Sequence, residues 1–336
     1  MHCICIDDIV YYCVYNKCRA FLSPWYEKGG MAPESDTDIP VFVGRWNAGA
    51  ISLNLPMIYM KAQQESKDFF EVLDYYLELI RKLHIKTYEF LGELRAGINP
   101  VAFCYGGFYQ GNLNQDDKIK PLLKYVTASF GITALNELQQ LYNKHSLYED
   151  SDFCLKVMQY INKKVQEYKE KDGYLYAIYG TPSENLCHQQ VKQFRKKYGI
   201  IENVSDREYF SNSFHCHVSE DITPIEKQDK EKQFWDLFNG GKIQYVRYPI
   251  NYNTESMKTI VRRAMTMGFY EGVNFHMSYC ANCGHEELEM KICPKCGSDD
   301  VVSINRVCGY LGYSRVHGRS YMNDGKMAEI ADRKSM

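Results

Sequence analysis

VFVGRWNAGAISLNLPMIYM, residues 41–60, is the stretch that indicates the type of fold. Around AISLNLP, apolar residues alternate with small or polar ones, which is typical of a buried strand ended by Pro56. Residues 61–95 then carry apolar side chains at three- and four-residue steps, which predicts a helix. This periodic set comprises Phe69, Phe70, Leu73, Tyr76, Leu77, Ile80 and Leu83. The stretch therefore predicts a strand that leads into a helix.

The alternation of strands and helices continues along the chain. Further helices are predicted at about 119–144, about 151–171, 183–199 (closed by Gly199) and 254–268 (closed by Gly268), and further strands at 174–180 and 242–250. Strands separated by helices of ten or more residues need crossover connections, so they are mostly parallel. The fold class is therefore α/β, either barrel-like or doubly wound.

Composition excludes several classes of protein. The 336 residues carry a formal net charge of −2, with 40 basic against 42 acidic residues, which gives no bulk attraction for nucleic acid or an acidic membrane. No apolar run is long enough for a membrane span, and the N-terminus lacks the basic region of a signal peptide. The 13 cysteines are scattered, apart from four grouped like metal ligands. Such cysteines point to a reducing compartment, so we expect a cytoplasmic protein.

The strongest local motif is CANCGHEELEMKICPKCGS, residues 280–298. It contains two CxxC pairs separated by nine residues, a spacing that unrelated free thiols rarely show and that suits a structural Zn²⁺ bound by four thiolates. A glycine follows the second cysteine of each pair and permits the positive φ that each metal knuckle needs. The predicted ligands are Cys280, Cys283, Cys293 and Cys296.

Zinc ribbons often bind nucleic acid, but the charge of this segment excludes that function. Residues 276–300 contain two lysines against five acidic residues, whereas phosphate attraction requires a basic patch. We therefore expect no nucleic-acid partner.

RVCGYLGYSRVHGRSYMNDGKMAEIADRKSM, residues 306–336, resembles the C-terminus of the anaerobic, class III ribonucleotide reductases. These glycyl radical enzymes carry a four-cysteine zinc site just before an RVxGYL loop, and a terminal GK..E...R stretch. Here that stretch is Gly325, Lys326, Glu329 and Arg333. Other segments that fit the family are KCRAFLSPW (17–25), GRWNAGAISLNLP (44–56), YGTPSENLC (179–187), SNSFHCHVSEDITPIEK (211–227), GGKIQYVRYPINYN (240–253) and GFYEGVNFH (268–276).

The resemblance implies part of a ten-stranded α/β barrel of the glycyl radical enzyme type, with a small C-terminal zinc ribbon and a glycyl radical loop. The implied organisation is a leader at 1–16 without resemblance, the C-terminal half of the catalytic barrel with its finger loop at 17–275, the zinc ribbon at 276–300, and the radical loop and tail at 301–336. Family chains are about twice as long and include an ATP-cone region and a second active-site cysteine. We therefore expect this chain to be a C-terminal fragment that needs an N-terminal half.

The resemblance assigns the glycyl radical to Gly309 and the thiyl radical to Cys18. Glycine suits the first role because, without a Cβ, its radical centre can become planar and the loop can approach another backbone closely. Taken alone, Gly309 would be a turn glycine and Cys18 a buried free thiol. Asn47 matches a family asparagine near the reacting sugar, and its plainer interpretation is a turn residue.

Thr181 and Ser183 lie where a strand runs into a helix N-terminus, a position that can bind the phosphates of a nucleotide. The alternative interpretation is structural: Thr181, Pro182 and Glu184 have the spacing of a helix capping box. His215 and His217 would share one face of a possible strand. Two histidines without a third ligand are weak evidence for a metal, so we expect only a wall of the site at His215.

The implied activity is anaerobic reduction of ribonucleoside triphosphates, in which the thiyl removes the 3′-hydrogen and the 2′-hydroxyl leaves as water. The implied partners are a radical S-adenosylmethionine activating enzyme with a 4Fe-4S cluster, and a second copy of the complete enzyme. Formate is the usual reductant of the family, although some members use a thiol-based one. Two alternatives stay open. Another glycyl radical enzyme of the formate-lyase type would lack the zinc pair, and a non-catalytic zinc-braced module would only dock the activating enzyme.

Overall fold

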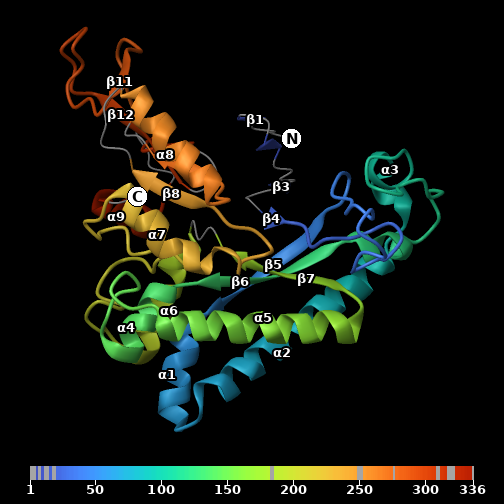
Figure 1. Cartoon of the computed structure of the whole chain (residues 1–336). Coiled ribbons are helices and arrows are strands. Elements are labelled where there is room, and N and C mark those ends of the chain that lie inside the picture. Colours follow the sequence, from blue (N-terminus) through green and yellow to red (C-terminus); the bar gives the residue numbers. More distant parts are fainter. Residues whose placement is uncertain are drawn as a thin grey trace.

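The computed structural model describes residues 5–6, 9–10, 15–16, 20–181, 185–247, 253–274, 277–307, 311–315 and 322–334. Short strands form two antiparallel pairs near the start of the chain. These are β1 (Cys5–Ile6) with β2 (Ile9–Val10), and β3 (Tyr15–Asn16) with β4 (Ala20–Phe21). The rest of the chain alternates strands and helices up to β9, as expected for an α/β protein (Figure 1).

Three parallel strands form the central sheet in the order β5-β6-β7. They are β5 (Asn47–Asn54), β6 (Thr127–Thr133) and β7 (Leu175–Gly180). The strand predicted ahead of Pro56 and the strand predicted at 174–180 are thus confirmed, although β5 is half-exposed rather than buried. The helix predicted at about 119–144 is wrong. That stretch holds a 3-10 helix (Lys120–Tyr125), then β6, then α4 (Leu135–Asn143). Every residue of β6 is buried, so it lacks the alternation that marks a half-buried strand.

The two faces of this sheet differ in chemistry. One face carries the apolar side chains of the three strands, Ile51, Leu53, Phe130, Ile132 and Ile178, all within or against the main hydrophobic core. Helices α2 (Phe69–Gly92) and α5 (Asp152–Asp172) lie together on one side of the sheet, where they cover this face (Figure 1). The opposite face carries mostly small and polar residues, with Leu175 and Tyr179 of β7 as its larger side chains.

The helix predicted over residues 61–95 is two helices. Helix α1 (Leu55–Glu65) begins directly after β5, with Asn54 as its N-cap and Pro56 in its first turn. It ends at Ser66, whose φ of 52° is left-handed. Asp68 then caps α2 by accepting hydrogen bonds from two backbone amides. The three- and four-residue spacing of apolar side chains continues across this break, because each of the two helices buries an apolar face.

Downstream elements extend the α/β pattern. Helices α6 (Leu186–Tyr198) and α7 (Pro224–Trp235) precede β8 (Gln244–Arg247), which pairs in parallel with β9 (Glu271–Asn274) across α8 (Thr254–Thr266). Residues 240–241 hydrogen-bond to β7 immediately before β8 begins. The strand predicted at 242–250 is confirmed for 244–247, and 248–250 lie outside the described residues. The four-residue helix α3 (Pro100–Phe103) lies in the segment between α2 and β6.

The C-terminal part holds a four-stranded antiparallel sheet in the order β11-β10-β12-β13. Its strands are β10 (Met277–Cys280), β11 (Glu286–Leu288), β12 (Val301–Arg306) and β13 (Leu311–Tyr313). Helix α9 (Asp324–Asp332) follows and contacts α6. Within the described residues, no helix is both long enough and apolar enough to cross a membrane.

Candidate active site and metal centre

The four predicted zinc ligands come together. The Sγ atoms of Cys280, Cys283, Cys293 and Cys296 all lie within 4.8 Å of one another. Each CxxC pair turns back on itself through the same two backbone hydrogen bonds. The amides of Gly284 and Gly297 donate to the carbonyls of Cys280 and Cys293, and the amides of these two cysteines donate to the carbonyls of His285 and Ser298. Both glycines have a φ of 72°. The glycines therefore serve the positive-φ turns that the sequence predicted.

The spacing of the sulfur atoms fits a tetrahedral ion. Two of the Sγ–Sγ distances are 3.6 Å (Cys280 to Cys296) and 3.5 Å (Cys283 to Cys293). Thiolates that bind one Zn²⁺ at about 2.3 Å in a tetrahedron lie about 3.8 Å apart. Four sulfur ligands leave no open coordination position, so an ion held here would brace the β10–β12 turns rather than bind substrate.

The terminal GK..E...R stretch forms a buried ionic cluster on α9. Glu329 accepts from Lys326 and Arg333, and all three side chains are at most 6% exposed. Burial alone would raise the pKa of Glu329, but the two cations outweigh it and lower that pKa to about 2. Asn212 and the main chain at residue 218 extend the contact to the segment after α6.

Gly325 explains why α9 can lie so close to α6. A Cβ at this position would be only 2.5 Å from the carbonyl oxygen of Glu208 and 2.6 Å from the His188 side chain. Only a glycine permits that approach. At the other end of α9, the Tyr209 hydroxyl donates to Asp332. The helix is thus fixed along its whole length against the α/β part.

Gly309 lies outside the described residues, but both flanks of its loop are described. On the upstream side, β12 ends at Arg306, which donates to the carbonyl of Val273 in β9, and Val307 is buried. On the downstream side, β13 pairs back onto β12, and α9 docks as described above. Along the chain, Gly309 therefore lies between β12 and β13, two strands of the four-cysteine sheet, and ahead of the ionic cluster on α9.

Cys18 also lies outside the described residues, yet the residues that follow it are anchored on the sheet. The Phe21 amide donates to the carbonyl of Gly240, whose own amide donates to Ile178 in β7. Gly240 lies against Ala177, where a Cβ would be only 2.7 Å away.

The polar face of the sheet contains the two described candidates, Asn47 and Thr181. Asn47 donates to Ser129 Oγ at 2.8 Å and accepts from the Gly49 amide, across the bulge at the start of β5. Thr181 Oγ1 lies 2.7 Å from Ser52 Oγ. This hydroxyl pair spans the face over Gly131, where a Cβ would meet both oxygens at 2.3–2.4 Å. Sequence reasoning missed Ser52 and Gly131, which only the strand register reveals.

Thr181 is not the N-cap of the following helix. Helix α6 begins at Leu186 with Asn185 as its N-cap, and Asn185 makes no side-chain capping bond. Ser183 and Glu184 lie outside the described residues, so the predicted capping box of Thr181 with Glu184 stays a prediction. A true capping box occurs at Thr223 and Glu226 of α7. The first turn of α6 contains no acidic residue. No negative side chain of that turn therefore opposes an anion at the positive end of the helix dipole.

His215 and His217 do not share the face of a strand, because the segment 211–219 is irregular. His215 Nδ1 lies 3.0 Å from Glu231, which also accepts from buried Lys227. His217 is stacked on Tyr209 and contacts Arg207, and burial followed by the Arg207 charge lowers its pKa to about 3. Each histidine has its own local partners, so the structure gives no metal pair here.

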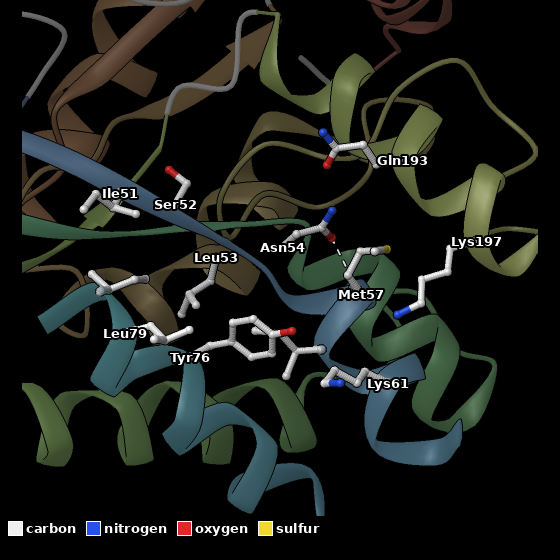
Figure 2. A pocket seen from close by; sticks show the side chains of 12 residues that line it. Ile51, Ser52, Leu53, Asn54, Met57, Lys61, Tyr76, Leu79, Gln193 and Lys197 are labelled. Atoms are coloured by element: carbon white, nitrogen blue, oxygen red, sulfur yellow. Dashed lines mark hydrogen bonds between the residues drawn. The ribbon is translucent and has the colours of Figure 1, made fainter. Parts of the chain in front are cut away.

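A pocket of about 300 Å³ opens at the outer edge of β5 (Figure 2). It is lined by both faces of β5, by α1 and α2, and by Gln193 and Lys197 of α6. Lys61 and Lys197 lie at its α1 end, and Ile51 and Leu79 at the other. Among the described residues, β5 pairs only with β6, so the pocket lies where a further strand would run.

Comparison with known proteins decides the family. The family model for anaerobic ribonucleoside-triphosphate reductase matches residues 7–336, beginning inside the segment 1–16 for which the motifs gave no resemblance. The chain belongs to the anaerobic ribonucleoside-triphosphate reductase family. It is 31% identical over 331 residues to the anaerobic ribonucleoside-triphosphate reductase of Haemophilus influenzae, and 30% identical to that of Enterobacteria phage T4. These alignments cover 94% of this chain but 45% and 52% of the two relatives, so the chain spans about half of their length.

Solved structures of the same family share the fold. An anaerobic ribonucleotide reductase matches with a TM-score of 0.65 at 19% identity, over 84% of this chain and 44% of that one. The anaerobic ribonucleotide reductase from Thermotoga maritima in complex with dATP and CTP matches with a TM-score of 0.61 at 19% identity, over 80% and 45%. The α/β architecture of this family member is therefore that of an anaerobic ribonucleotide reductase.

Proposed function

We propose that this chain supplies the radical-bearing half of an anaerobic ribonucleoside-triphosphate reductase. The observation that carries the proposal is that residue 309 lies, along the chain, between the four-cysteine cluster and the buried Lys326–Glu329–Arg333 cluster. Two independently stabilised elements on either side of this position in the sequence fit a backbone site that must be held accurately. Membership of the family supplies the type of chemistry.

In the proposed reaction, Gly309 stores the radical and takes a hydrogen atom from the Cys18 thiol. The resulting thiyl removes the 3′-hydrogen of the ribonucleotide, and the 2′-hydroxyl leaves as water after protonation. Two electrons then complete the reduction, and formate supplies them by oxidation to carbon dioxide. Asn47 lines the sugar site on the polar face of the sheet.

The triphosphate is proposed to lie at the start of α6. Thr181 ends the polar face next to Ser52, and the N–H groups of the first turn of α6 carry no side-chain cap from Asn185. A helix N-terminus of this kind favours phosphate oxygens through its unpaired donors and its dipole. Ser183 is the adjacent hydroxyl of this phosphate loop.

Zinc bound by the four cysteines would brace the glycyl loop, and a 4Fe-4S activating enzyme with S-adenosylmethionine would generate the radical. The proposed domains follow the same division: the barrel half at 17–275 with its finger loop, the zinc ribbon at 276–300, and the radical loop and tail at 301–336. The complete enzyme is proposed to be a cytoplasmic homodimer.

The ten-stranded barrel is proposed to close at the outer edge of β5. That edge has no partner strand among the described residues, and a pocket lies beside it. Helix α2 adds an exposed apolar stripe of Tyr75, Leu79, Leu83 and Phe90. Unpaired edges and apolar stripes of this kind are association surfaces, so the remaining length of the relatives would pair here.

The test is anaerobic reduction of CTP by the chain together with the part of the Haemophilus influenzae relative that it does not cover. Activating enzyme, S-adenosylmethionine and formate are added, and dCTP is measured by mass spectrometry. We expect product with the wild type and with Cys104→Ser, but none with Cys18→Ser. Absence of dCTP from an assembled complex that carries the glycyl radical would contradict the proposal.

A further inference from the structure

The outer edge of β5 lacks the features that protect a free strand edge. The six residues from Gly49 to Asn54, which follow the bulge at its start, contain no charged residue and no proline. Natural edge strands usually carry charged side chains, prolines or bulges, because an unprotected edge pairs with other strands. Within the described part of the chain, β5 pairs only with β6. The sequence of β5 is therefore that of an interior strand, which indicates a further strand at its outer edge.

The pocket beside this edge is apolar at one end (Figure 2). Ile51 of β5 lies there with Leu79 and Ile80 of α2. Ile51 belongs to the face of the sheet that packs on the main core, yet Leu79 at the same end of the pocket is 42% exposed. Covering such a side chain with another apolar group removes apolar surface from water, which is favourable. This end of the pocket therefore accepts an apolar side chain.

The other end of the pocket gathers hydrogen-bond donors. Asn54 Oδ1 accepts from the Met57 amide at 3.3 Å, whereas its Nδ2 is buried and has no hydrogen-bond partner. Gln193 and Lys197 of α6 and Lys61 of α1 lie at the same end (Figure 2). A buried donor without an acceptor is costly. The group that fills this end therefore has to accept hydrogen bonds.

The charges at this end favour a carboxylate over a neutral acceptor. Lys61 is paired with Glu65, which does not line this pocket. Within the described residues, Lys197 forms no ion pair, and its Nζ lies 4.9 Å from the centre of the Tyr198 ring. The first turn of α1, which begins here, contains no acidic residue, so the positive end of its helix dipole is not compensated. An anionic acceptor therefore fits this end best.

We propose that the part of the reductase that this chain does not cover supplies a strand to the outer edge of β5, with a carboxylate side chain level with Asn54 and an apolar one level with Ile51. The carboxylate accepts from Asn54 Nδ2 and pairs with Lys197, and the apolar side chain lies against Leu79. The relatives extend beyond this chain by about half of their length, so a segment for this strand exists in them.

The inference deepens the proposed function, because it rests on the barrel closing at β5. It also predicts a sequence pattern. Ile51 and Asn54 are three positions apart in a strand, so they lie on opposite faces. The carboxylate and the apolar residue of the partner strand are therefore three positions apart as well.

The experiment titrates the full chain with the part of the Haemophilus influenzae relative that it does not cover, and calorimetry gives Kd. Lys197→Glu replaces an attraction by a repulsion and should weaken binding about 10-fold. Added salt should weaken binding of the wild type more than that of this variant. Lys196→Glu is the matched control, because it makes the same charge change at an exposed neighbour that does not line the pocket, and it should keep the wild-type Kd.

The apolar end is tested in the same titration. Leu79→Asp should weaken binding, since the carboxylate would have to be buried against an apolar side chain. Ile292→Asp, the same kind of change at an exposed isoleucine of the C-terminal part, should not weaken it. All four variants change exposed side chains, so their thermal midpoints should stay at the wild-type value.

Cross-linking with a carbodiimide, which joins an ammonium group to a carboxylate in contact with it, identifies the partner residue. We expect a peptide that links Lys197 to an aspartate or glutamate of the relative, with an apolar residue three positions away. Links from Lys197 only to carboxylates of its own chain would overturn the proposal.

The remaining outcomes separate this inference from the proposed function. Equal Kd values for Lys197→Glu and Lys196→Glu would overturn the inference, while dCTP formation by the same complex would leave the proposed function standing. No binding to the wild-type chain would contradict both the inference and closure of the barrel at β5. Self-association of the chain alone that Lys197→Glu abolishes would assign the edge to a second copy and would also overturn the inference.

Discussion

The sheet part of the molecule, residues 20–274, and the C-terminal part, residues 277–334, are stabilised by different interactions. The sheet part buries one large apolar cluster from its strands and helices. Among the described residues of the C-terminal sheet, the apolar cluster is small and consists of Cys280, Met290 and Cys293, with Val301 packed against it. Its structure depends instead on four sulfur atoms and on the charges of α9. The proposed radical position, Gly309, therefore belongs to the part of the chain that carries the four-cysteine cluster and the buried charges of α9.

This difference has a physical consequence. Apolar burial responds weakly to chelators and to single charge changes, whereas a metal knuckle and a buried ion cluster can each be removed by one substitution. The two parts should thus lose their structure independently of each other, and each prediction below tests that independence.

The largest loss of structure is expected from Cys293→Ser. Structural zinc sites contribute about 10–16 kcal/mol of binding free energy, so loss of one thiolate should release the ion and open β10–β12. Zinc analysis should give one ion per chain for the wild type and much less for the variant. Limited proteolysis should then cut within 277–307 and spare the sheet part.

Cys104→Ser is the control for this substitution, because Cys104 is a half-buried thiol far from the cluster in sequence. It should keep full zinc and the wild-type cleavage pattern. If Cys293→Ser retained its zinc, or if it unfolded the sheet part as well, the two parts would not be independent.

A smaller effect is expected from Glu329→Gln. This change leaves Lys326 and Arg333 buried without their anion, which costs about 3–5 kcal/mol. Hydrogen exchange should rise over residues 322–334 and stay unchanged in β6. Asp324→Asn, at an exposed position of the same helix, should show neither change. Equal exchange in the Glu329 and Asp324 variants would mean that the ionic cluster does not hold α9.

The smallest expected effect is a loss of folding stability at acidic pH. His84 is buried against the Ser129 carbonyl of β6, and burial lowers its pKa to about 4. The unfolded chain binds a proton at this histidine below its ordinary pKa of about 6.5, so stability is complete above that pH and falls toward pH 4. At pH 5 the loss should be about 2 kcal/mol from this group.

Denaturant unfolding from pH 7 to pH 4.5 measures this loss. His84→Gln should flatten the pH dependence of the sheet part, and His145→Gln, at an exposed histidine, should not. An identical slope in wild type and His84→Gln would show that His84 is not held neutral in the folded state.

The sequence predicted most of the fold and the metal site, for physical reasons. CxxC spacing determines the knuckles almost by itself, so the four cysteines could be found without a structure. Strand β7 and helices α5 and α8 carry clear apolar patterns and were correctly predicted. Strand β6 could not be found, because a strand buried on both faces has no period of two. The break between α1 and α2 was missed for the opposite reason, since the apolar period continues across it.

The site was less predictable than the fold. Ser52 and Thr181 are 129 residues apart, and only the register of three parallel strands brings their hydroxyls together over Gly131. Helix α6 begins at Leu186 with Asn185 as its N-cap, so Thr181 does not cap that helix directly.

The most direct test of the central claim is electron paramagnetic resonance of the anaerobically activated chain. Wild type and Gly309→Ala are each treated with activating enzyme, reductant and S-adenosylmethionine, using an activating enzyme shown to work on an intact reductase. The account predicts a doublet from an organic radical in the wild type and no such signal in Gly309→Ala. No radical in a wild-type chain with full zinc occupancy, or the same radical in Gly309→Ala, would contradict it.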